Sequence, residues 1–303
     1  MTSPYDDWEF DAYLRDNAHL SANTVRAYKS GYTKIMEGLS RSLRNSAQVN
    51  VIKQIGRLSK SPNSINQLLN IAIQVRRYHR MPVELLLKRR ERNQAKIDAH
   101  KDEVNAQKAA VLPSLEELKA WRDQLYIDGR ERDYLINFLL LQYHTRNKDL
   151  DVAIVARKSQ AKDPNTNYLL LRKNDIVYIR RNYKTAGTYG EKRYTFKNRK
   201  VREALRKFIS EQQGGGEYHY PHYGVVWLLS TGENQRIGEH SIGKFIRGRT
   251  LHGLSEGDYN KVQVSRINDL GDFRLLQKMS KARGTSVDNL ITEYHLNFKS
   301  SDP

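Results

Sequence analysis

The chain has 303 residues with 38% hydrophobic residues, enough for two domains of ordinary size, and a mean hydropathy of −0.76. It has no cysteine, no stretch near 18 consecutive apolar residues and no basic-then-apolar start, which argues against disulfides, cysteine-based zinc sites, membrane spans and a secretory signal. Its 52 Lys and Arg against 34 Asp and Glu give a net charge of +18, which predicts a polyanionic partner, nucleic acid ahead of an anionic membrane surface.

The first part of the chain, residues 1–93, predicts a compact helical domain. Apolar residues recur at helical spacing in four segments, the first of them around Phe10, Tyr13 and Leu14. The sequence LSANT offers caps for the second segment, and SPNS (61–64) separates the third from the fourth. No alternation typical of a strand appears here.

A polar segment follows and marks the predicted domain boundary. Residues 88–111 are charged and contain almost no large apolar side chain, which is typical of an exposed helix or a linker. Because few core contacts can cross such a segment, we place a linker at 94–111.

Residues 112–303 predict a second, mixed α/β domain. It opens at VLPSLEELKAW, where Ser114 and Glu117 have the spacing of a capping box, and a buried helix follows at 134–145. NYLLLRK, DIVYIRRNYK and KRYTF then predict three short strands, with TAGTYGE as a hairpin turn. From about 200 onward the pattern is helical, apart from the loop at 212–224. The expected fold is mainly α, in two domains, with a small antiparallel sheet in the second.

Cofactor chemistry is poorly supported by the sequence. There is no glycine-rich nucleotide loop of known type, and GGGE (214–217) is typical of a surface loop. His219 and His222 lie three residues apart in a Pro/Gly/Tyr loop, where such a pair is far more often incidental than a metal site. The expectation is no metal and no nucleotide cofactor.

Five polar residues attract attention through their local contexts. Arg146 follows a buried helix, and Asp149 lies one helical turn on, where it would hold the guanidinium. Lys184 ends a predicted strand, Arg266 lies on a predicted helix, and Tyr294 is one of 18 tyrosines. Taken singly, each has a more ordinary explanation as a salt bridge, a solvated strand end, an exposed helix residue or a packed aromatic.

Together and in order, these contexts resemble the tyrosine recombinase (phage integrase) family over nearly the whole chain. WEFDAYLRDNAHLSANTVRAYKSGYTKIM (8–36) resembles its amino-terminal core-binding (SAM-like) helices, and VLPSLEELKAW the start of its catalytic domain. HTRNKDL is similar to the first arginine box, QVSR (263–266) to the second, and GVVWLLS (224–230) to the segment after the sheet. RGTS (283–286) resembles the segment before the tyrosine.

The resemblance implies a site-specific DNA recombinase or integrase that works without metal or nucleotide. Tyr294 would form a covalent 3′-phosphotyrosine, Arg146 and Arg266 would clamp the phosphate, and Lys184 would protonate the leaving oxygen. Gln263 stands at a position where the family usually has His, and Thr285 at a position where it usually has His or Trp. These two residues motivate one alternative, a relative that binds DNA without cutting it; a type IB topoisomerase is the other.

The implied partner is double-stranded DNA, bound by a homo-oligomer that in the family is a tetramer. The setting is intracellular, in a prokaryotic host, a nucleus or a viral compartment. Residues 171–206 hold 12 Lys and Arg against 3 Asp and Glu, so we expect much of the phosphate contact there. The expected DNA contacts are Asn23, Thr24, Arg26, Lys88, Arg89, Arg90, Arg180, Arg181, Lys192 and Arg193.

Overall fold

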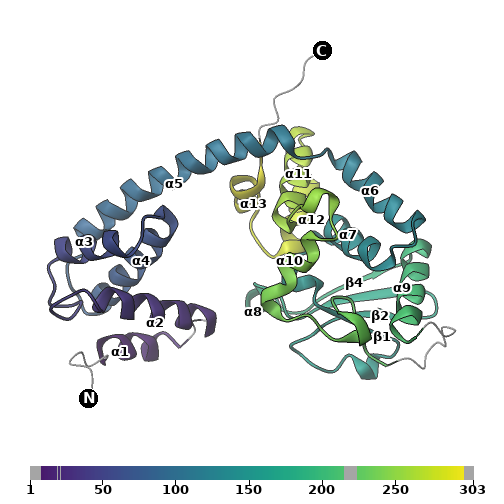
Figure 1. The fold of residues 1–303 in the computed structure, drawn as a ribbon, viewed down its shortest axis with the longest axis horizontal. Coiled ribbons are helices and arrows are strands. Elements are labelled where there is room, and N and C mark those ends of the chain that lie inside the picture. The colour runs from purple at the N-terminus through teal and green to yellow at the C-terminus, as the bar shows by residue number, and fades with distance from the viewer. Residues whose placement is uncertain (1–7, 19, 21, 215–223, 297–303) are drawn as a thin grey trace, which may run out of the picture. The chain divides into compact units, whose positions relative to one another are not determined.

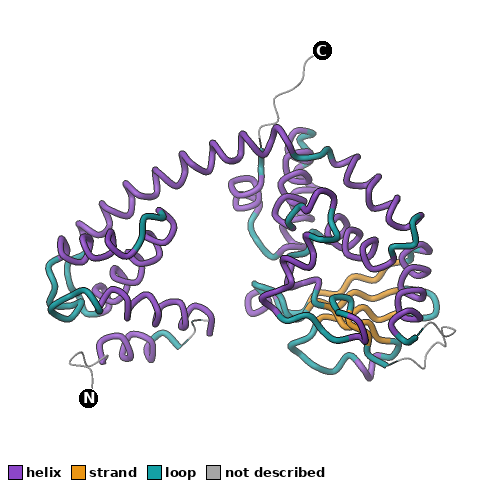
Figure 2. Tube along the Cα trace, in the orientation of Figure 1, coloured by secondary structure: helices purple, strands orange, loops and turns teal. Residues whose placement is uncertain are grey.

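A computed structural model describes residues 8–18, 20, 22–214 and 224–296 of the chain (Figures 1 and 2). The chain divides into two compact units, Met1–Asn105 and Ala106–Pro303. The boundary lies inside a 28-residue helix, so the segment proposed as a linker, 94–111, is helical.

Among the residues described in the first unit, all regular secondary structure is helical. Its core contains Ile35, Leu69, Ala72 and Leu86, all of them fully buried. Helices α2 and α4 cross closely, because a Cβ atom on Gly31 would lie only 2.3 Å from Cδ1 of Ile71. The helices of this unit are α1 (Trp8–Asp16), α2 (Ala22–Met36), α3 (Gln48–Leu58), α4 (Pro62–Tyr78) and α5 (Glu84–Val111), which continues into the second unit.

Helix α5 is polar around its whole circumference, as its sequence indicates. Of its 28 residues only Leu86 and Asn93 are buried. The Asn93 carboxamide donates to the Asn66 side chain at 2.8 Å and to the carbonyl oxygen of Pro62 at 2.6 Å. A short polar network therefore ties the first half of α5 to α4, where apolar packing is sparse.

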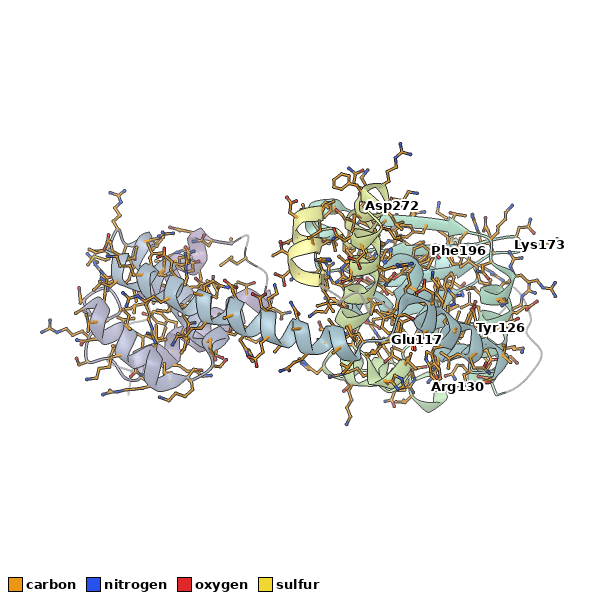
Figure 3. All side chains as sticks on the ribbon, turned by 90° about the horizontal axis from the view of Figure 1, so that it is seen from above. Glu117, Tyr126, Arg130, Lys173, Phe196 and Asp272 are labelled. Carbon is orange, nitrogen blue, oxygen red and sulfur yellow. The ribbon has the colours of Figure 1, made fainter. Side chains whose placement is uncertain are left out.

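The second unit surrounds a small sheet with helices. The predicted capping box is present at the start of α6: the Ser114 hydroxyl accepts from the Glu117 amide, and the Glu117 carboxylate accepts from the Ser114 amide. Figure 3 labels Glu117 and Tyr126 near the two ends of this helix. The α-helices are α6 (Leu115–Ile127), α7 (Glu131–Tyr143), α8 (Ala186–Tyr189), α9 (Arg199–Gln212), α10 (Ile242–Arg247), α11 (Glu256–Asp269), α12 (Phe273–Arg283) and α13 (Val287–Tyr294). The 3₁₀ turns are η1 (Asn147–Leu150), η2 (Lys158–Gln160), η3 (Gly232–Asn234), η4 (Glu239–Ser241) and η5 (Leu251–Gly253).

The sheet has five strands in the order β4-β3-β2-β1-β5. It is mixed, because β1 runs parallel to β2 while the other neighbours are antiparallel; the prediction of an antiparallel sheet was therefore wrong for this pair. The three predicted strands are present, and β1 was missed. The strands are β1 (Val152–Val155), β2 (Asn167–Leu171), β3 (Ile176–Arg180), β4 (Lys192–Phe196) and β5 (Val226–Trp227).

The two faces of the sheet bury different sets of side chains, as the two-residue period of a strand requires. Ile154, Leu169 and Tyr178 face the main core with α7 and α9, which lie over this face in Figure 1. Ala153 and Leu170 belong to a smaller cluster on the other face. Because both faces of the central strands are covered, their sequences are continuously apolar.

Candidate functional site

Tyr294 is the last residue of α13, a short helix docked on α11. The Ser286 hydroxyl caps α13 by accepting from the amide of Asn289, and Leu290 is fully buried beneath it. Ser265 of α11 accepts from the backbone amide of Leu296 at 2.7 Å, which fixes the chain just after the tyrosine. Tyr294 is half-buried, and its position is set by contacts on both sides of it.

Arg283, at the end of α12, lies directly against Tyr294. Its Nη2 donates to the tyrosine hydroxyl at 2.9 Å, and its guanidinium carbon lies 4.9 Å from the centre of the tyrosine ring. Only 1% of Arg283 is exposed, and its Nη1 donates to the carbonyl oxygen of His144 at 3.0 Å. The basic residue adjoining the tyrosine is therefore Arg283.

Arg266, the second arginine expected from the sequence, lies on the exposed side of α11. Its neighbours Ser265 and Ile267 are buried, so the helix turns the Arg266 side chain away from the core. Among the described residues Arg266 has no hydrogen bond to Tyr294, whose hydroxyl is bound by Arg283, so the role of Arg266 stays a prediction.

Glu256, the first residue of α11, supplies a negative charge to the site. Its Oε1 lies 3.4 Å from Nη2 of Arg283, and its other oxygen accepts from the backbone amide of Asn147. Burial raises the pKa of the Glu256 carboxyl, against the opposing effect of Arg283. The only signal for Glu256 in the sequence is the preference for acidic residues in the first turn of a helix.

Arg146 also reaches this region, as the sequence predicted. It is half-buried after the left-handed His144 that ends α7, and its Nη1 donates to the carbonyl oxygen of Arg283 at 2.7 Å. Burial, followed by the nearby Arg283, lowers its pKa. Asp149 accepts from the backbone amide of Arg146 at 2.9 Å, so it orients the Arg146 backbone and does not bind its guanidinium.

The guanidinium that Asp149 does bind belongs to Arg180. Both side chains are fully buried, and Nη2 of Arg180 is paired with Oδ2 of Asp149. Nη1 of Arg180 donates to the carbonyl oxygen of Ala282 at 2.8 Å. The prediction that Arg180 contacts DNA was wrong, because a fully buried guanidinium cannot reach a phosphate on the surface.

Lys192, expected as a DNA contact, binds the last turn of α12, whereas no such bond involves Lys184 among the described residues. Lys184 is exposed in the segment between β3 and α8. Lys192, the first residue of β4, is half-buried; its Nζ donates to the carbonyl oxygens of Lys281 and Ala282 and lies 4.9 Å from the ring centre of Tyr183. Burial, with a contribution from Arg180, lowers the pKa of Lys192 to about 8. Lys192 is thus a second candidate beside Lys184, whose predicted role stays a prediction.

These contacts converge on the last turn of α12. Lys192, Arg180 and Arg146 donate to consecutive backbone carbonyl oxygens of residues 281–283, and Thr185 donates to that of Gly284 at 3.0 Å. The final carbonyls of a helix lack partners within the helix and carry the negative end of its dipole. In this structure they hold three cationic side chains within one small region beside Tyr294.

Gln263 and Thr285 have no hydrogen bond to Tyr294 among the described residues. Gln263 is buried, and its amide nitrogen donates to the carbonyl oxygens of Tyr259 at 3.2 Å and Leu140 at 3.4 Å. The Thr285 hydroxyl accepts from the Asn289 side chain at 3.3 Å, at the start of α13. Both side chains are engaged in holding helices together.

The other expected DNA contacts fall into two groups. In the first unit, Asn23 and Thr24 line a hollow of about 680 Å³ between α2 and α4, together with Lys34, Gln67 and Asn70. Arg26, Lys88 and Arg89 are exposed, and Arg90 donates to Asn70 at 3.1 Å.

In the second unit, Arg181 and Arg193 share the carboxylate of Glu191. Arg193 is exposed, whereas Arg181 also donates to the carbonyl oxygens of Ala161 at 2.9 Å and Asp163 at 3.1 Å. Arg181 is therefore largely committed to contacts within the unit.

Two further structural observations bear on the classes considered from the sequence. Within the described ranges, no group of three or more His, Cys, Asp or Glu side chains is arranged to hold a metal ion, and His219 and His222 lie outside those ranges. Among the described residues, no helix combines the length and apolar character needed to cross a membrane.

Comparison with known proteins adds little. No protein-family model and no curated protein matches the chain. A crystal structure of XerA recombinase aligns with 12% identity over 95% of this chain and 94% of that chain, with a TM-score of 0.37.

Proposed function

We propose that the protein breaks and rejoins DNA through a covalent phosphotyrosine formed by Tyr294. The observation that carries this proposal is the hydrogen bond between Arg283 and the Tyr294 hydroxyl, with Arg146, Arg180 and Lys192 gathered beside it. A buried or half-buried cluster of four cations needs an anion, and among the described side chains only Asp149 and Glu256 supply one there.

The chemistry that suits this cluster is transfer of a phosphodiester. The tyrosine oxygen attacks phosphorus, the bond from phosphorus to the 5′ oxygen breaks, and the proton of the tyrosine is lost to solvent or a nearby base. Negative charge gathers on the nonbridging oxygens, which fixed guanidinium groups stabilise. Arg283 and Arg146 are the two proposed to contact them, and Arg180 with Asp149 positions the Arg146 backbone.

Lys192 is proposed as the general acid. The departing 5′ oxygen is a poor leaving group unless a proton is delivered to it, and an ammonium whose pKa is lowered to about 8 is well matched to that task near neutral pH. The reverse steps, in which the 5′ hydroxyl attacks the phosphotyrosine and returns its proton to Lys192, rejoin the strand. The proposal assigns no step to a metal or nucleotide.

The first unit is proposed to read or grip the duplex through the α2–α4 hollow. Its lining of Asn, Thr, Gln and Lys side chains offers donors and acceptors of the kind that contact base edges and phosphates. The resemblance of residues 8–36 to core-binding helices supports the same assignment. On this proposal the second unit cuts and the first unit holds; a tetramer on DNA remains an expectation of the resemblance.

A second function has one specific observation in its favour. The Gln263 amide nitrogen is committed to two backbone carbonyl oxygens, and neither Gln263 nor Thr285 can exchange a proton near neutral pH as histidine does. This favours a protein that binds DNA without cutting it. The type IB topoisomerase shares the proposed chemistry and differs in needing no specific site.

The test is the detection of a covalent protein–DNA adduct. The wild-type protein and Tyr294→Phe are incubated with nicked candidate target duplexes and analysed under denaturing conditions. The proposal expects an adduct with the wild type and none with Tyr294→Phe, which keeps the ring packed on Arg283. An adduct that persists in Tyr294→Phe removes Tyr294 from the role.

Two other outcomes identify the alternatives. Tight binding of a target duplex without any adduct favours the non-cutting protein. Relaxation of any supercoiled plasmid, without a specific site, favours the topoisomerase.

A further inference from the structure

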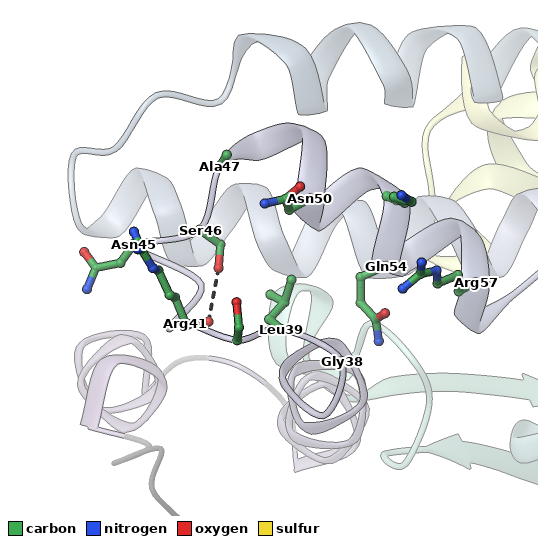
Figure 4. A pocket seen from close by; sticks show the side chains of 11 residues that line it. Gly38, Leu39, Arg41, Asn45, Ser46, Ala47, Asn50, Gln54 and Arg57 are labelled. Atoms are coloured by element: carbon green, nitrogen blue, oxygen red, sulfur yellow. Dashed lines mark hydrogen bonds between the residues drawn. The ribbon is translucent and has the colours of Figure 1, made fainter.

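The first unit contains a second polar hollow, separate from the one between α2 and α4. It has a volume of about 490 Å³ and lies between the segment that follows α2 and one face of α3 (Figure 4). The residues that matter to its chemistry are Gly38, Arg41, Asn50, Lys53, Gln54 and Arg57. None of the residues that line it is acidic.

Gln54 is the buried polar group of this hollow. Only 8% of the residue is exposed, and its carboxamide lies at the wall of the hollow. Figure 4 shows this side chain extending from α3 towards Gly38. A Cβ atom on Gly38 would lie 2.0 Å from Nε2 of Gln54, so the glycine makes room for the carboxamide. A carboxamide that lines a hollow can donate hydrogen bonds to a ligand that enters it.

The charge around Gln54 indicates what that ligand is. Arg41, Lys53 and Arg57 line the hollow and are all exposed. They belong to a segment, 38–83, that contains 8 Lys and Arg and no Asp or Glu. Three cations with an amide donor and no carboxylate among them favour a phosphate group over a neutral or cationic ligand.

We infer that this hollow, which we call the α3 pocket, binds a phosphate of the DNA backbone, with the Gln54 amide as a donor and Arg41, Lys53 and Arg57 as its counter-charges. Arg57 lines the α3 pocket and the next residue, Leu58, lines the α2–α4 hollow, so the last turn of α3 contributes to both hollows. A duplex held in the α2–α4 hollow can thus continue over the α3 pocket. The inference rests on the DNA-binding part of the proposed function and not on strand cleavage.

The experiment measures the affinity of the full chain for a labelled duplex at several salt concentrations. Lys53→Gln and Arg57→Gln should each reduce the steepness of the salt dependence by about one unit, as expected for one lost phosphate contact. Arg15→Gln, which removes an exposed charge on α1 outside the pocket, is the control and should leave the steepness unchanged. If Arg15→Gln has the same effect, overall charge explains the result and the pocket does not.

Two glycine variants test the carboxamide without changing charge. Gly38→Ala forces the Gln54 side chain to move, whereas Gly56→Ala on α3 meets nothing within 4 Å. Gly38→Ala should weaken DNA binding about three- to tenfold, and Gly56→Ala should not. Gln54→Leu should reproduce the loss, and thermal melting by circular dichroism establishes that each variant is folded. Wild-type affinity in folded Gly38→Ala and Gln54→Leu overturns the inference.

A titration with inorganic phosphate distinguishes a site for a DNA phosphate from a site for free phosphate. Phosphate is titrated into the wild type and Gly38→Ala, and the NMR signals of the pocket residues are followed. If phosphate shifts these signals in the wild type only, while the pocket variants bind DNA normally, the pocket is a site for free phosphate and the DNA assignment is overturned. The adduct assay remains independent of both results. If the wild type forms no adduct but the pocket variants lose DNA affinity, the pocket assignment stands and the cleavage function is rejected. If the wild type forms the adduct and the pocket variants keep their DNA affinity, the cleavage function stands and the pocket assignment is rejected.

Discussion

The guanidinium of Arg283 donates to the hydroxyl oxygen of Tyr294 at 2.9 Å, although the two residues belong to different helices. Gly284 makes this possible. It ends α12 in the left-handed conformation, with φ of 66°, and a Cβ atom there would lie 2.4 Å from the Thr185 hydroxyl. The turn between α12 and α13 therefore requires glycine both for its backbone conformation and for its contact with the β3–β4 connection.

Substitutions of Arg283 and Arg266 should distinguish the roles of these two arginines in cleavage. Arg283→Gln removes the charged donor at the tyrosine and should lower the rate of adduct formation about 100- to 1,000-fold, the usual cost of one such donor. Arg266→Gln removes an exposed charge and should change the rate by less than about fivefold once DNA is saturating. Single-turnover cleavage of a nicked duplex measures both. Equal losses in the two variants would contradict the assignment of Arg283.

Lys192 and Lys184 form a second matched pair. If Lys192 is the general acid, Lys192→Ala should lower cleavage about 100-fold or more, whereas Lys184→Ala should have a small effect. A substrate with sulfur in place of the bridging 5′ oxygen needs no proton for departure and should restore the rate of Lys192→Ala. Failure of this rescue would assign Lys192 a role in packing the last turn of α12.

The acid role also predicts a pH dependence. Burial lowers the pKa of Lys192 to about 8, and a general acid acts only in its protonated form. The contribution of Lys192 should therefore be present below pH 8 and be lost as the pH rises through that value. The ratio of wild-type to Lys192→Ala rates, measured from pH 6.5 to pH 9.5, should fall across this range; a constant ratio would contradict the prediction.

The parts of the fold that could be predicted are those with a clear hydrophobic periodicity or with capping and turn residues at their ends. The Ser114 capping box and the strands β2, β3 and β4 stand where the sequence indicated. Strand β1 was missed because VAIV is four buried residues with no alternation, and such a run does not distinguish a strand from part of a buried helix. Its parallel pairing with β2 depends on a crossover that no local pattern reveals.

The candidate site likewise has residues that local sequence indicated and residues that depend on tertiary packing. Local context was enough to single out Arg146 and Tyr294, which the structure brings to one region. It could not choose between Arg266 and Arg283, because that choice depends on which face of α11 is buried. The signal for Arg283 was available only weakly, as a basic residue in a last helical turn followed by glycine. Lys192 likewise depends on how the β3–β4 connection packs on α12.

The buried pair of Asp149 and Arg180 should be important for stability. Asp149→Asn leaves the Arg180 guanidinium buried without its counter-charge and should lower the free energy of unfolding by about 3–5 kcal/mol. Asp151→Asn is the control, because its partner Arg236 is 41% exposed and a pair of this kind contributes only about 1 kcal/mol or less. Urea denaturation followed by circular dichroism measures both. A loss below about 1 kcal/mol for Asp149→Asn would show that solvent reaches Arg180.

His144 should make the fold sensitive to mild acid. Burial, and then the neighbouring Arg283, lowers the pKa of His144 to about 4, from 6.5 for an exposed histidine. The unfolded chain therefore binds a proton that the folded chain rejects, and stability is lost as the pH falls from about 6.5 to 4.

The matched variants for this prediction share one backbone conformation. His144 and His252 both have left-handed φ values, of 50° and 52°, which asparagine tolerates, but His252 is exposed. Between pH 7 and pH 5 the wild type should lose about 2 kcal/mol more of its unfolding free energy than His144→Asn does. His252→Asn should lose as much as the wild type. Parallel pH dependences for His144→Asn and the wild type would mean that the buried imidazole is protonated in the folded protein.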